Sequence, residues 1–197
     1  MIRTFEQKEV ENLAKFGSIP VINGLTDFCH PCQVLADLMT IREKFGSFSG
    51  LKMCFIGDGN NMANSLIVGG LKVGMNVAVA TPDGYKPDGA VLEFTKGYGD
   101  KFALEIDPFM AASVADILIT DTWTSMGEEA EKEERKKIFK DYQIQQTAPR
   151  GRNAALWSST VSRHTADRRS PRKSSRNMPT RSSMRQRTAC MRRRLLW

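Results

Sequence analysis

Short apolar runs alternate with amphipathic segments along the first three quarters of the chain. Four runs are rich in β-branched residues and end in polar or glycine-containing turns, as buried parallel strands do: residues 20–25, 51–56, 75–80 and 116–120. Around them, apolar side chains recur at helical spacing in four segments: residues 6–16, 33–45, 62–73 and 128–142. This alternation predicts an α/β fold with a doubly wound parallel sheet, whose ligands bind at the carboxyl ends of the strands.

The pattern stops near residue 146, and the charge changes at the same place. Residues 1–146 contain 15 Lys/Arg and 21 Asp/Glu, whereas residues 147–197 contain 14 Lys/Arg and a single acid. The net charge of +7 therefore combines a body of −6 with a tail of +13. The tail is rich in Arg and Ser and has no hydrophobic period, so we expect residues 146–197 to be disordered. Such a tail would bind nucleic acid nonspecifically through phosphates, but the acidic body excludes a basic nucleic-acid-binding domain.

Composition also excludes two other classes of protein. No apolar run approaches the roughly 18–20 residues of a membrane span, and the first ten residues lack the character of a signal peptide. The four cysteines are too few and too clustered for a disulfide framework: Cys29, Cys32, Cys54 and Cys190. We therefore expect a cytoplasmic protein with no membrane partner.

A Cys-x-x-Cys motif, Cys29 and Cys32, lies between a predicted strand and a predicted helix. A helix N-terminus stabilises a thiolate, so this setting is that of a thioredoxin-type redox pair. A metal site formed by the two cysteines and His30 lacks a second pair of ligands elsewhere in the chain. Alternatively, His30 and Gln33 aim two donors and the helix dipole at an oxyanion or carbonyl. The remaining interpretation is a helix cap with incidental thiols.

Two other strand ends carry candidate binding residues. The turn IGDGNNMANS (56–65) departs from the dinucleotide-binding G-x-G-x-x-G pattern, because Met62 stands where the last glycine would be. Its asparagines would hold the polar groups of an amino acid, or would cap the following helix. In TDTWTSMGEE (120–129), Asp121 would bind an ammonium group, and the Ser-Met-Gly loop would close over a ligand. The alternative is that Asp121 or Ser125 caps the next helix.

Taken together and in order, four segments resemble consecutive blocks of the ornithine carbamoyltransferases: PVINGLTDFCHPCQVLADLMTI, FIGDGNNMANS, VATPDGYKPD and LITDTWTSMGEEAEKEERKKIFKDYQI. The resemblance covers residues 1–144, and the Ser-Met-Gly sequence favours the ornithine enzymes over their aspartate-using relatives. It implies transfer of the carbamoyl group of carbamoyl phosphate to the δ-amine of L-ornithine, giving citrulline and phosphate, in arginine metabolism and without a metal or organic cofactor. The alternative within the family is a related amine, putrescine or an acylated ornithine.

The resemblance also assigns positions to the two substrates. Three residues match the positions that bind carbamoyl phosphate: Arg3, His30 and Gln33. Four match the positions that bind ornithine: Asn61, Asp121, Ser125 and Met126. Cationic and amide donors would stabilise the charge that develops on oxygen as the amine attacks, and Asp121 would orient the amine. On this interpretation Cys29 and Cys32 have no chemical role.

Three family motifs do not occur in frame: a Ser-Thr-Arg-Thr phosphate loop, the His-Cys-Leu-Pro that supplies the family's proton-accepting cysteine, and a later Glu-Asn-Arg. We therefore predict that the catalytic set is not intact and that the chain as written is inactive. The family is trimeric, and its amino-terminal domain supplies much of the interface. We accordingly do not expect this chain to form the homotrimer.

We hypothesise that the tail results from a frameshift, in the gene or in its sequencing. Residues 159–167, STVSRHTAD, can be written in codons that give His-Cys-Leu-Pro when read two nucleotides later, and the same shift gives Glu-Asn-Arg within 181–194. We therefore predict a frameshift between about residues 143 and 146. The expected organisation has four parts: a remnant of the carbamoyl-phosphate-binding domain (1–29), an interdomain helix (30–46), an incomplete ornithine-binding domain (47–145) and an out-of-frame tail (146–197).

Overall fold

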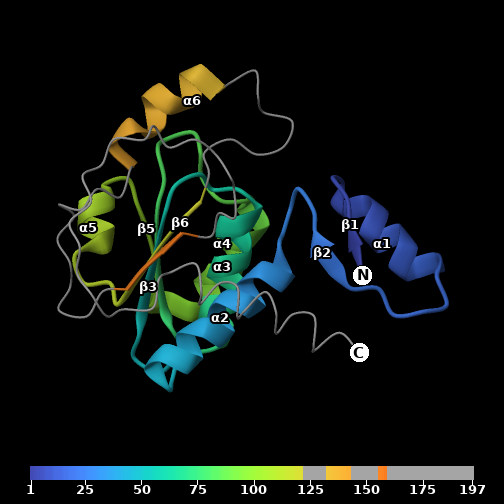
Figure 1. Ribbon diagram of the computed structural model, residues 1–197. Helices are drawn as coiled ribbons and strands as arrows, with labels where there is room; N and C mark the ends of the chain where they lie inside the picture. The colour runs from blue at the N-terminus through green and yellow to red at the C-terminus, as the bar shows by residue number, and fades with distance from the viewer. Residues whose placement is uncertain (122–131, 143–154, 159–197) are drawn as a thin grey trace, which may run out of the picture. The chain divides into compact units, whose positions relative to one another are not determined.

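Parallel strands form two sheets in the residues that the structure, a computed structural model, describes: 1–121, 132–142 and 155–158 (Figure 1). The small sheet pairs β1 (Ile2–Arg3) with β2 (Asn23–Leu25). The large sheet has five strands: β3 (Lys52–Ile56), β4 (Asn76–Ala80), β5 (Phe102–Glu105), β6 (Ile117–Thr120) and β7 (Ala155–Ser158). Their order is β5-β4-β3-β6-β7, and every neighbouring pair is parallel. The predicted α/β class with parallel sheets is confirmed.

Helices alternate with these strands, and three of them begin at a residue whose side chain caps the first turn. The helical elements are α1 (Gln7–Phe16), α2 (Pro31–Phe45), α3 (Asn61–Lys72), α4 (Gly89–Thr95), α5 (Pro108–Ala112), α6 (Lys132–Ile138) and the 3-10 helices η1 (Lys96–Lys101) and η3 (Phe139–Tyr142). The side chains of Asn60, Asp88 and Asp107 accept backbone N–H groups at the starts of α3, α4 and α5. None of the helices in the described part of the chain has the length and apolar character that a bilayer span requires.

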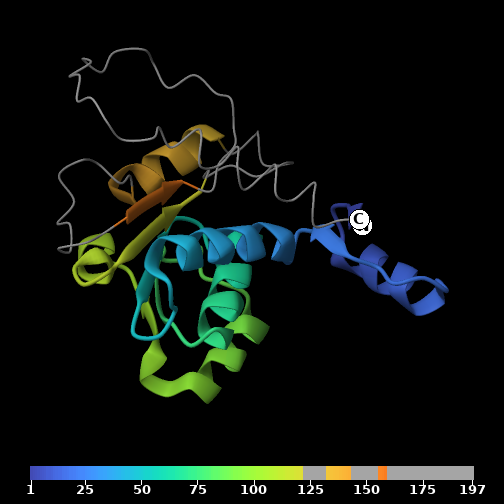
Figure 2. The same ribbon diagram turned by 60° about the horizontal axis from the view of Figure 1, so that its bottom comes forward.

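The large sheet separates two layers of side chains. Successive residues of β3 point to opposite faces, as strand geometry requires. Met53 and Phe55 pack among apolar side chains of α2, α3 and α4, whereas Cys54 and Ile56 pack against α5 and η3. Helices therefore cover both faces of the sheet (Figure 2). This two-sided burial explains why the strands are apolar throughout rather than alternating in polarity.

Two consecutive glycines let α3 pack closely against its neighbours. A Cβ atom on Gly69 would lie 2.5 Å from Cγ1 of Val34 in α2, and one on Gly70 would lie 2.7 Å from Cγ2 of Val77 in β4. Glycine is otherwise unfavourable inside a helix, so close packing accounts for both residues. The result is that the C-terminal half of α3 lies directly against the first turn of α2, which carries the candidate ligands His30 and Gln33.

Most elements predicted from the hydrophobic pattern are present, with ends displaced by one or two residues: α1, α2, α3, β3, β4 and β6. The predicted strand over 20–25 is shorter and comprises only Asn23–Leu25. The predicted helix over 128–142 is observed as α6 followed by η3, while residues 128–131 lie outside the described residues.

Among the described residues, the hydrophobic pattern missed six short elements: β1, α4, η1, β5, α5 and β7. Helices α4 and α5 have seven and five residues, too few for a helical period to stand out. The prediction that 146–197 has no regular structure is wrong at Ala155–Ser158, which pairs in parallel with β6. The physical reason is an apolar Ala-Leu-Trp sequence beside the edge of β6, whose backbone N–H and C=O groups need partners.

Candidate functional site

The turn between β3 and α3 is held against the loop that follows β4. The backbone N–H of Gly57 donates to the carbonyl of Ala80 at 3.1 Å, and that of Gly59 donates to the carbonyl of Tyr85 at 2.9 Å. A Cβ atom on Gly59 would lie only 2.3–2.4 Å from backbone atoms of residues 85–87. Glycine is therefore required here by the close approach of two backbones, and this contact fixes where α3 begins.

Side chains from the start of α3 hold the backbone that leads into α2. The amide of Asn61 donates to the carbonyl of Thr26 at 2.6 Å, and the amide of Asn64 donates to the carbonyl of Phe28 at 3.0 Å. The Asn64 side-chain oxygen accepts the backbone N–H of Asp88, also at 3.0 Å. Thr26 and Asn64 are buried. Hydrogen bonds in such places rigidify a segment, because its polar groups cannot exchange them for water.

A third side chain of α3, Ser65, joins two predicted ligands. Its hydroxyl oxygen accepts the backbone N–H of His30 at 2.8 Å and donates its proton to the carbonyl of Asn61 at 2.8 Å. Ser65 is 9% exposed. The structure therefore brings together His30, predicted to bind carbamoyl phosphate, and Asn61, predicted to bind ornithine.

His30 and Gln33 lie at the start of α2. His30 is the N-cap residue, and the backbone N–H of Gln33 donates to its carbonyl at 3.1 Å. The side-chain amide of Gln33 donates to Oδ1 of Asp37, one turn further along, at 2.9 Å. Both predicted donors thus lie at the positive end of a 15-residue helix, an environment that favours an anionic or carbonyl ligand.

Arg3 approaches the same segment through backbone pairing. It lies on β1 opposite Leu25 of β2, one residue before Thr26, and its side chain is exposed. Asp121 directly follows β6, which pairs with β3 so that Thr120 lies opposite Ile56. Asp121 therefore leaves the sheet at the same edge as the turn into α3.

Ser125 and Met126, the other two predicted ornithine ligands, lie outside the described residues.

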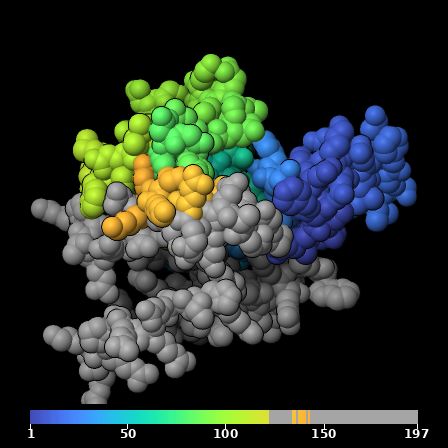
Figure 3. All heavy atoms as spheres, turned by 90° about the horizontal axis from the view of Figure 1, so that it is seen from above, coloured from blue at the N-terminus to red at the C-terminus, as the bar shows by residue number. Residues whose placement is uncertain are grey.

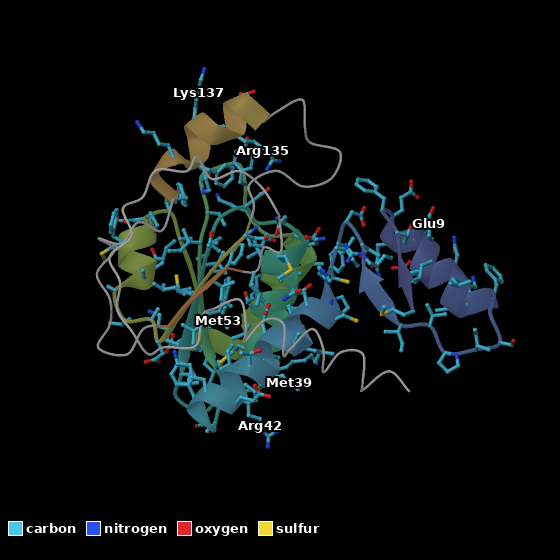
Figure 4. All side chains as sticks on the ribbon, in the orientation of Figure 1. Glu9, Met39, Arg42, Met53, Arg135 and Lys137 are labelled. Atoms are coloured by element: carbon cyan, nitrogen blue, oxygen red, sulfur yellow. The ribbon has the colours of Figure 1, made fainter. Side chains whose placement is uncertain are left out.

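A buried ion pair beside this turn was not predicted from the sequence. Arg135 of α6 contacts Asp58 at 2.6 Å, and their side chains are only 8% and 10% exposed. The guanidinium also lies 5.1 Å from the ring centroid of Tyr85, which makes an edge contact with Phe139. Figure 4 shows Arg135 on the side of α6 that faces the sheet, whereas Lys137 points away. In Figure 3, α6 (orange) lies against the green residues that follow β4.

The two cysteines of the Cys-x-x-Cys motif both contact Asn23 of β2. The Asn23 amide donates to Sγ of Cys29 at 3.2 Å, and the Cys32 thiol donates to the Asn23 carbonyl at 3.3 Å. Burial raises the pKa of the Cys29 thiol. A redox-active cysteine needs a lowered pKa, so this environment argues against the redox interpretation. Within the described ranges, no group of three or more His, Cys, Asp or Glu side chains is arranged to hold a metal ion.

Comparison with protein families gives two adjoining matches. Residues 1–43 match the carbamoyl-P binding domain of aspartate/ornithine carbamoyltransferase, and residues 49–152 match its Asp/Orn binding domain. The first range contains Arg3, His30 and Gln33, and the second contains Asn61 and the other predicted ornithine ligands. The boundary between the two matches falls at the end of α2.

Individual proteins with similar sequences are named ornithine carbamoyltransferases. The chain is 53% identical over 148 residues to the ornithine carbamoyltransferase of Thermococcus kodakarensis, covering 73% of this chain and 47% of the relative. It is 51% identical, over the same length and coverage, to the anabolic ornithine carbamoyltransferase of Pyrococcus furiosus. The solved structure of an ornithine carbamoyltransferase from Pyrococcus furiosus superposes with a TM-score of 0.74 at 45% identity, covering 82% of this chain and 53% of that one. The chain thus spans about half the length of the curated relatives it matches.

Proposed function

The chain belongs to the aspartate/ornithine carbamoyltransferase family, and we propose that it carries parts of both substrate-binding regions of an ornithine carbamoyltransferase. In this reaction the δ-nitrogen of L-ornithine forms a bond to the carbonyl carbon of carbamoyl phosphate. The C–O bond to phosphate breaks, and the products are citrulline and phosphate. The family's proton acceptor, the cysteine of His-Cys-Leu-Pro, does not occur in this sequence in frame.

The observation that carries the proposal is the link between His30 and Asn61 through the Ser65 hydroxyl. It joins a residue predicted to hold the carbamoyl group to a residue predicted to hold the amino acid. Two substrates bound so close together react as if at a very high effective concentration, which supplies much of the rate of a group transfer. Donors at the start of α2 would stabilise the negative charge that develops on the carbonyl oxygen.

The domain organisation belongs to the same proposal. Residues 1–29 form the remnant of the carbamoyl-phosphate domain, 30–46 the interdomain helix and 47–145 the incomplete ornithine domain. Support comes from the two family matches, which adjoin between residues 43 and 49, where α2 ends at Phe45. No metal or organic cofactor enters the proposed reaction.

Binding of the amino acid tests the proposal, because binding can be measured without turnover. Isothermal titration of the 197-residue chain should detect L-ornithine and show weaker binding of putrescine and of N-acetyl-L-ornithine. Putrescine lacks the carboxylate, and the acetyl derivative lacks a charged α-amine. Failure to bind ornithine, or equal binding of either analogue, would overturn the assignment of ornithine as the substrate.

A charge-neutralising substitution separates a ligand from an ordinary surface carboxylate. Asp121→Asn should weaken ornithine binding about tenfold or more, because the acceptor of the hydrogen bond from the ammonium group loses its negative charge. The matched control is Asp107→Asn at the N-cap of α5, where asparagine caps equally well and the net charge changes by the same amount. Equal affinities in the two variants would remove Asp121 from the proposed site.

A further inference from the structure

The hydroxyl of Ser65 accepts one hydrogen bond and donates another, and each bond joins it to a residue of one of the two candidate subsites. A serine hydroxyl carries one proton, and that of Ser65 goes to the carbonyl of Asn61, one helical turn earlier. Its lone pairs are thereby turned toward the backbone N–H of His30, which lies 35 residues away in sequence. The orientation of the hydroxyl is fixed by the helix, so the position of His30 follows from that of α3.

The His30 N–H has no acceptor within its own helix. His30 is the N-cap residue of α2, and the N–H groups at a helix start have no intrahelical carbonyl to bind. Ser65, from a different helix, supplies the acceptor in a part-buried place. Removing the hydroxyl would take the Ser65 acceptor away from this N–H and would loosen the backbone that carries the His30 side chain.

Asn61 and Asn64 reinforce the arrangement at both ends of the same short segment. Their side-chain amides donate to the carbonyls of Thr26 and Phe28, and the Ser65 hydroxyl accepts the backbone N–H of His30. Three side chains within five residues of α3 therefore define the path of residues 26–30. Of these three side chains, that of Ser65 contacts a predicted ligand residue of each substrate.

We propose that Ser65 is a positioning residue that sets His30 and Asn61 relative to each other, so that the carbamoyl-phosphate and ornithine subsites are coupled through one buried hydroxyl. This rests on the proposed function. Ser65 itself contacts neither substrate in the proposal. It acts through the backbone of the residues that do.

The first measurement that tests the role of Ser65 is made without any ligand. Hydrogen exchange of the His30 backbone amide, followed by NMR, should accelerate about tenfold in Ser65→Ala, because one hydrogen bond is lost. Ser65→Thr keeps the hydroxyl and should restore slow exchange. Thr95→Val is the matched control: it removes a buried hydroxyl that donates to the Leu92 carbonyl of its own helix α4, and it should leave His30 exchange unchanged.

The second readout is affinity. Titration of each variant with L-ornithine and, separately, with fresh carbamoyl phosphate should show both affinities reduced about fivefold or more in Ser65→Ala, restored in Ser65→Thr and unchanged in Thr95→Val. A role in stability alone would lower the melting temperature of Ser65→Ala and Thr95→Val alike without this selective loss of affinity.

Unchanged His30 exchange in Ser65→Ala overturns the positioning role, whatever the ligands do. Faster exchange with both affinities intact also overturns it, because His30 would then move without consequence for binding. If the unaltered chain binds neither compound, the proposed function fails and the role of Ser65 fails with it, an outcome distinct from the other two. Should Ser65→Ala not fold, Ser65→Cys, with its weaker hydrogen-bonding group, is expected to give intermediate exchange and affinity.

Discussion

Gly59 lies where two backbone segments come closer than any side chain permits. A methyl group there would meet backbone atoms of residues 85–87, which cannot rotate away as a side chain could. Gly59→Ala is therefore expected to lower the free energy of unfolding by about 2 kcal/mol or more, measured by urea denaturation. Gly89→Ala is the matched control, because Gly89 also lies close to a helix start, as the first residue of α4, but has nothing within 4 Å of the added carbon. Equal stability of the two variants would contradict the close contact.

Cys54 makes the stability of the protein depend on pH in the alkaline range. Burial in the sheet raises the pKa of its thiol from the ordinary value of 9.0 to about 12. The folded state therefore keeps a proton that the unfolded state releases above about pH 9, so stability falls as pH rises through that range. Between about pH 8 and about pH 10, the loss should be about 1 kcal/mol more for the unaltered protein than for Cys54→Ala. Urea denaturation at both pH values measures this, and parallel losses in the two proteins would contradict it.

The candidate ligands differ in how far the sequence could predict them. His30, Gln33 and Asn61 stand in motifs that can be read over a few residues. Ser65 gave no such signal, because its importance comes from a partner 35 residues away. Asp58 likewise gains its role only from Arg135, 77 residues further along. Local patterns therefore point to candidate ligand residues, but they do not reveal residues whose contacts come from distant parts of the chain.

At the scale of elements, the ion pair between Arg135 and Asp58 attaches α6 to the turn after β3. Removing one partner of a buried pair leaves the other charge uncompensated. Arg135→Met should therefore lower the free energy of unfolding by about 3 kcal/mol and increase backbone hydrogen exchange across α6. The control, Lys96→Met, breaks an exposed pair with Glu93 and should cost no more than about 0.5 kcal/mol. Similar losses in the two variants would show that the buried pair does not anchor α6.

The lengths and contacts of the individual elements explain why the hydrophobic pattern predicted some of them and missed others. Helices of ten or more residues with a packed face, such as α2 and α3, show their period in the sequence. The five-residue α5 is set by its Asp107 cap and Pro108 rather than by any period. Strand β7 depends on the edge of β6, a partner that the sequence of β7 does not reveal.

For the whole molecule, the expected activity follows from the motifs absent from the sequence as written. The 197-residue chain should form no citrulline above background from ornithine and carbamoyl phosphate, because it lacks the family's phosphate loop and proton-accepting cysteine in frame. A colorimetric citrulline assay measures this, with the Pyrococcus furiosus enzyme as a positive control. Turnover close to that of the control would overturn the inference that these motifs are needed.

The change from a net negative to a net positive charge near residue 146 is also a property of the whole molecule. The match to the Asp/Orn binding domain ends at residue 152, close to where acids disappear from the sequence. This coincidence supports the frameshift hypothesis. The nucleotide sequence across codons 143–149 is expected to contain a site where a single-nucleotide change restores a frame encoding His-Cys-Leu-Pro. If no such change opens that frame, the hypothesis is wrong and the basic tail is a genuine part of the protein.

The hydrogen bonds from α3 to the backbone of residues 26–30 have a consequence for the construction of chimaeras between enzymes of this family. The family matches adjoin after α2, which makes residues 43–49 the obvious junction for a chimaera. A chimaera joined there would pair the α3 side chains of one parent with the 26–30 backbone of another. Asn61, Asn64 and Ser65 would then face carbonyls and an N–H for which they were not selected. The segment that must be exchanged as a unit is therefore expected to run from Thr26 to at least Ser65. This segment crosses the boundary between the two family matches, which lies between residues 43 and 49.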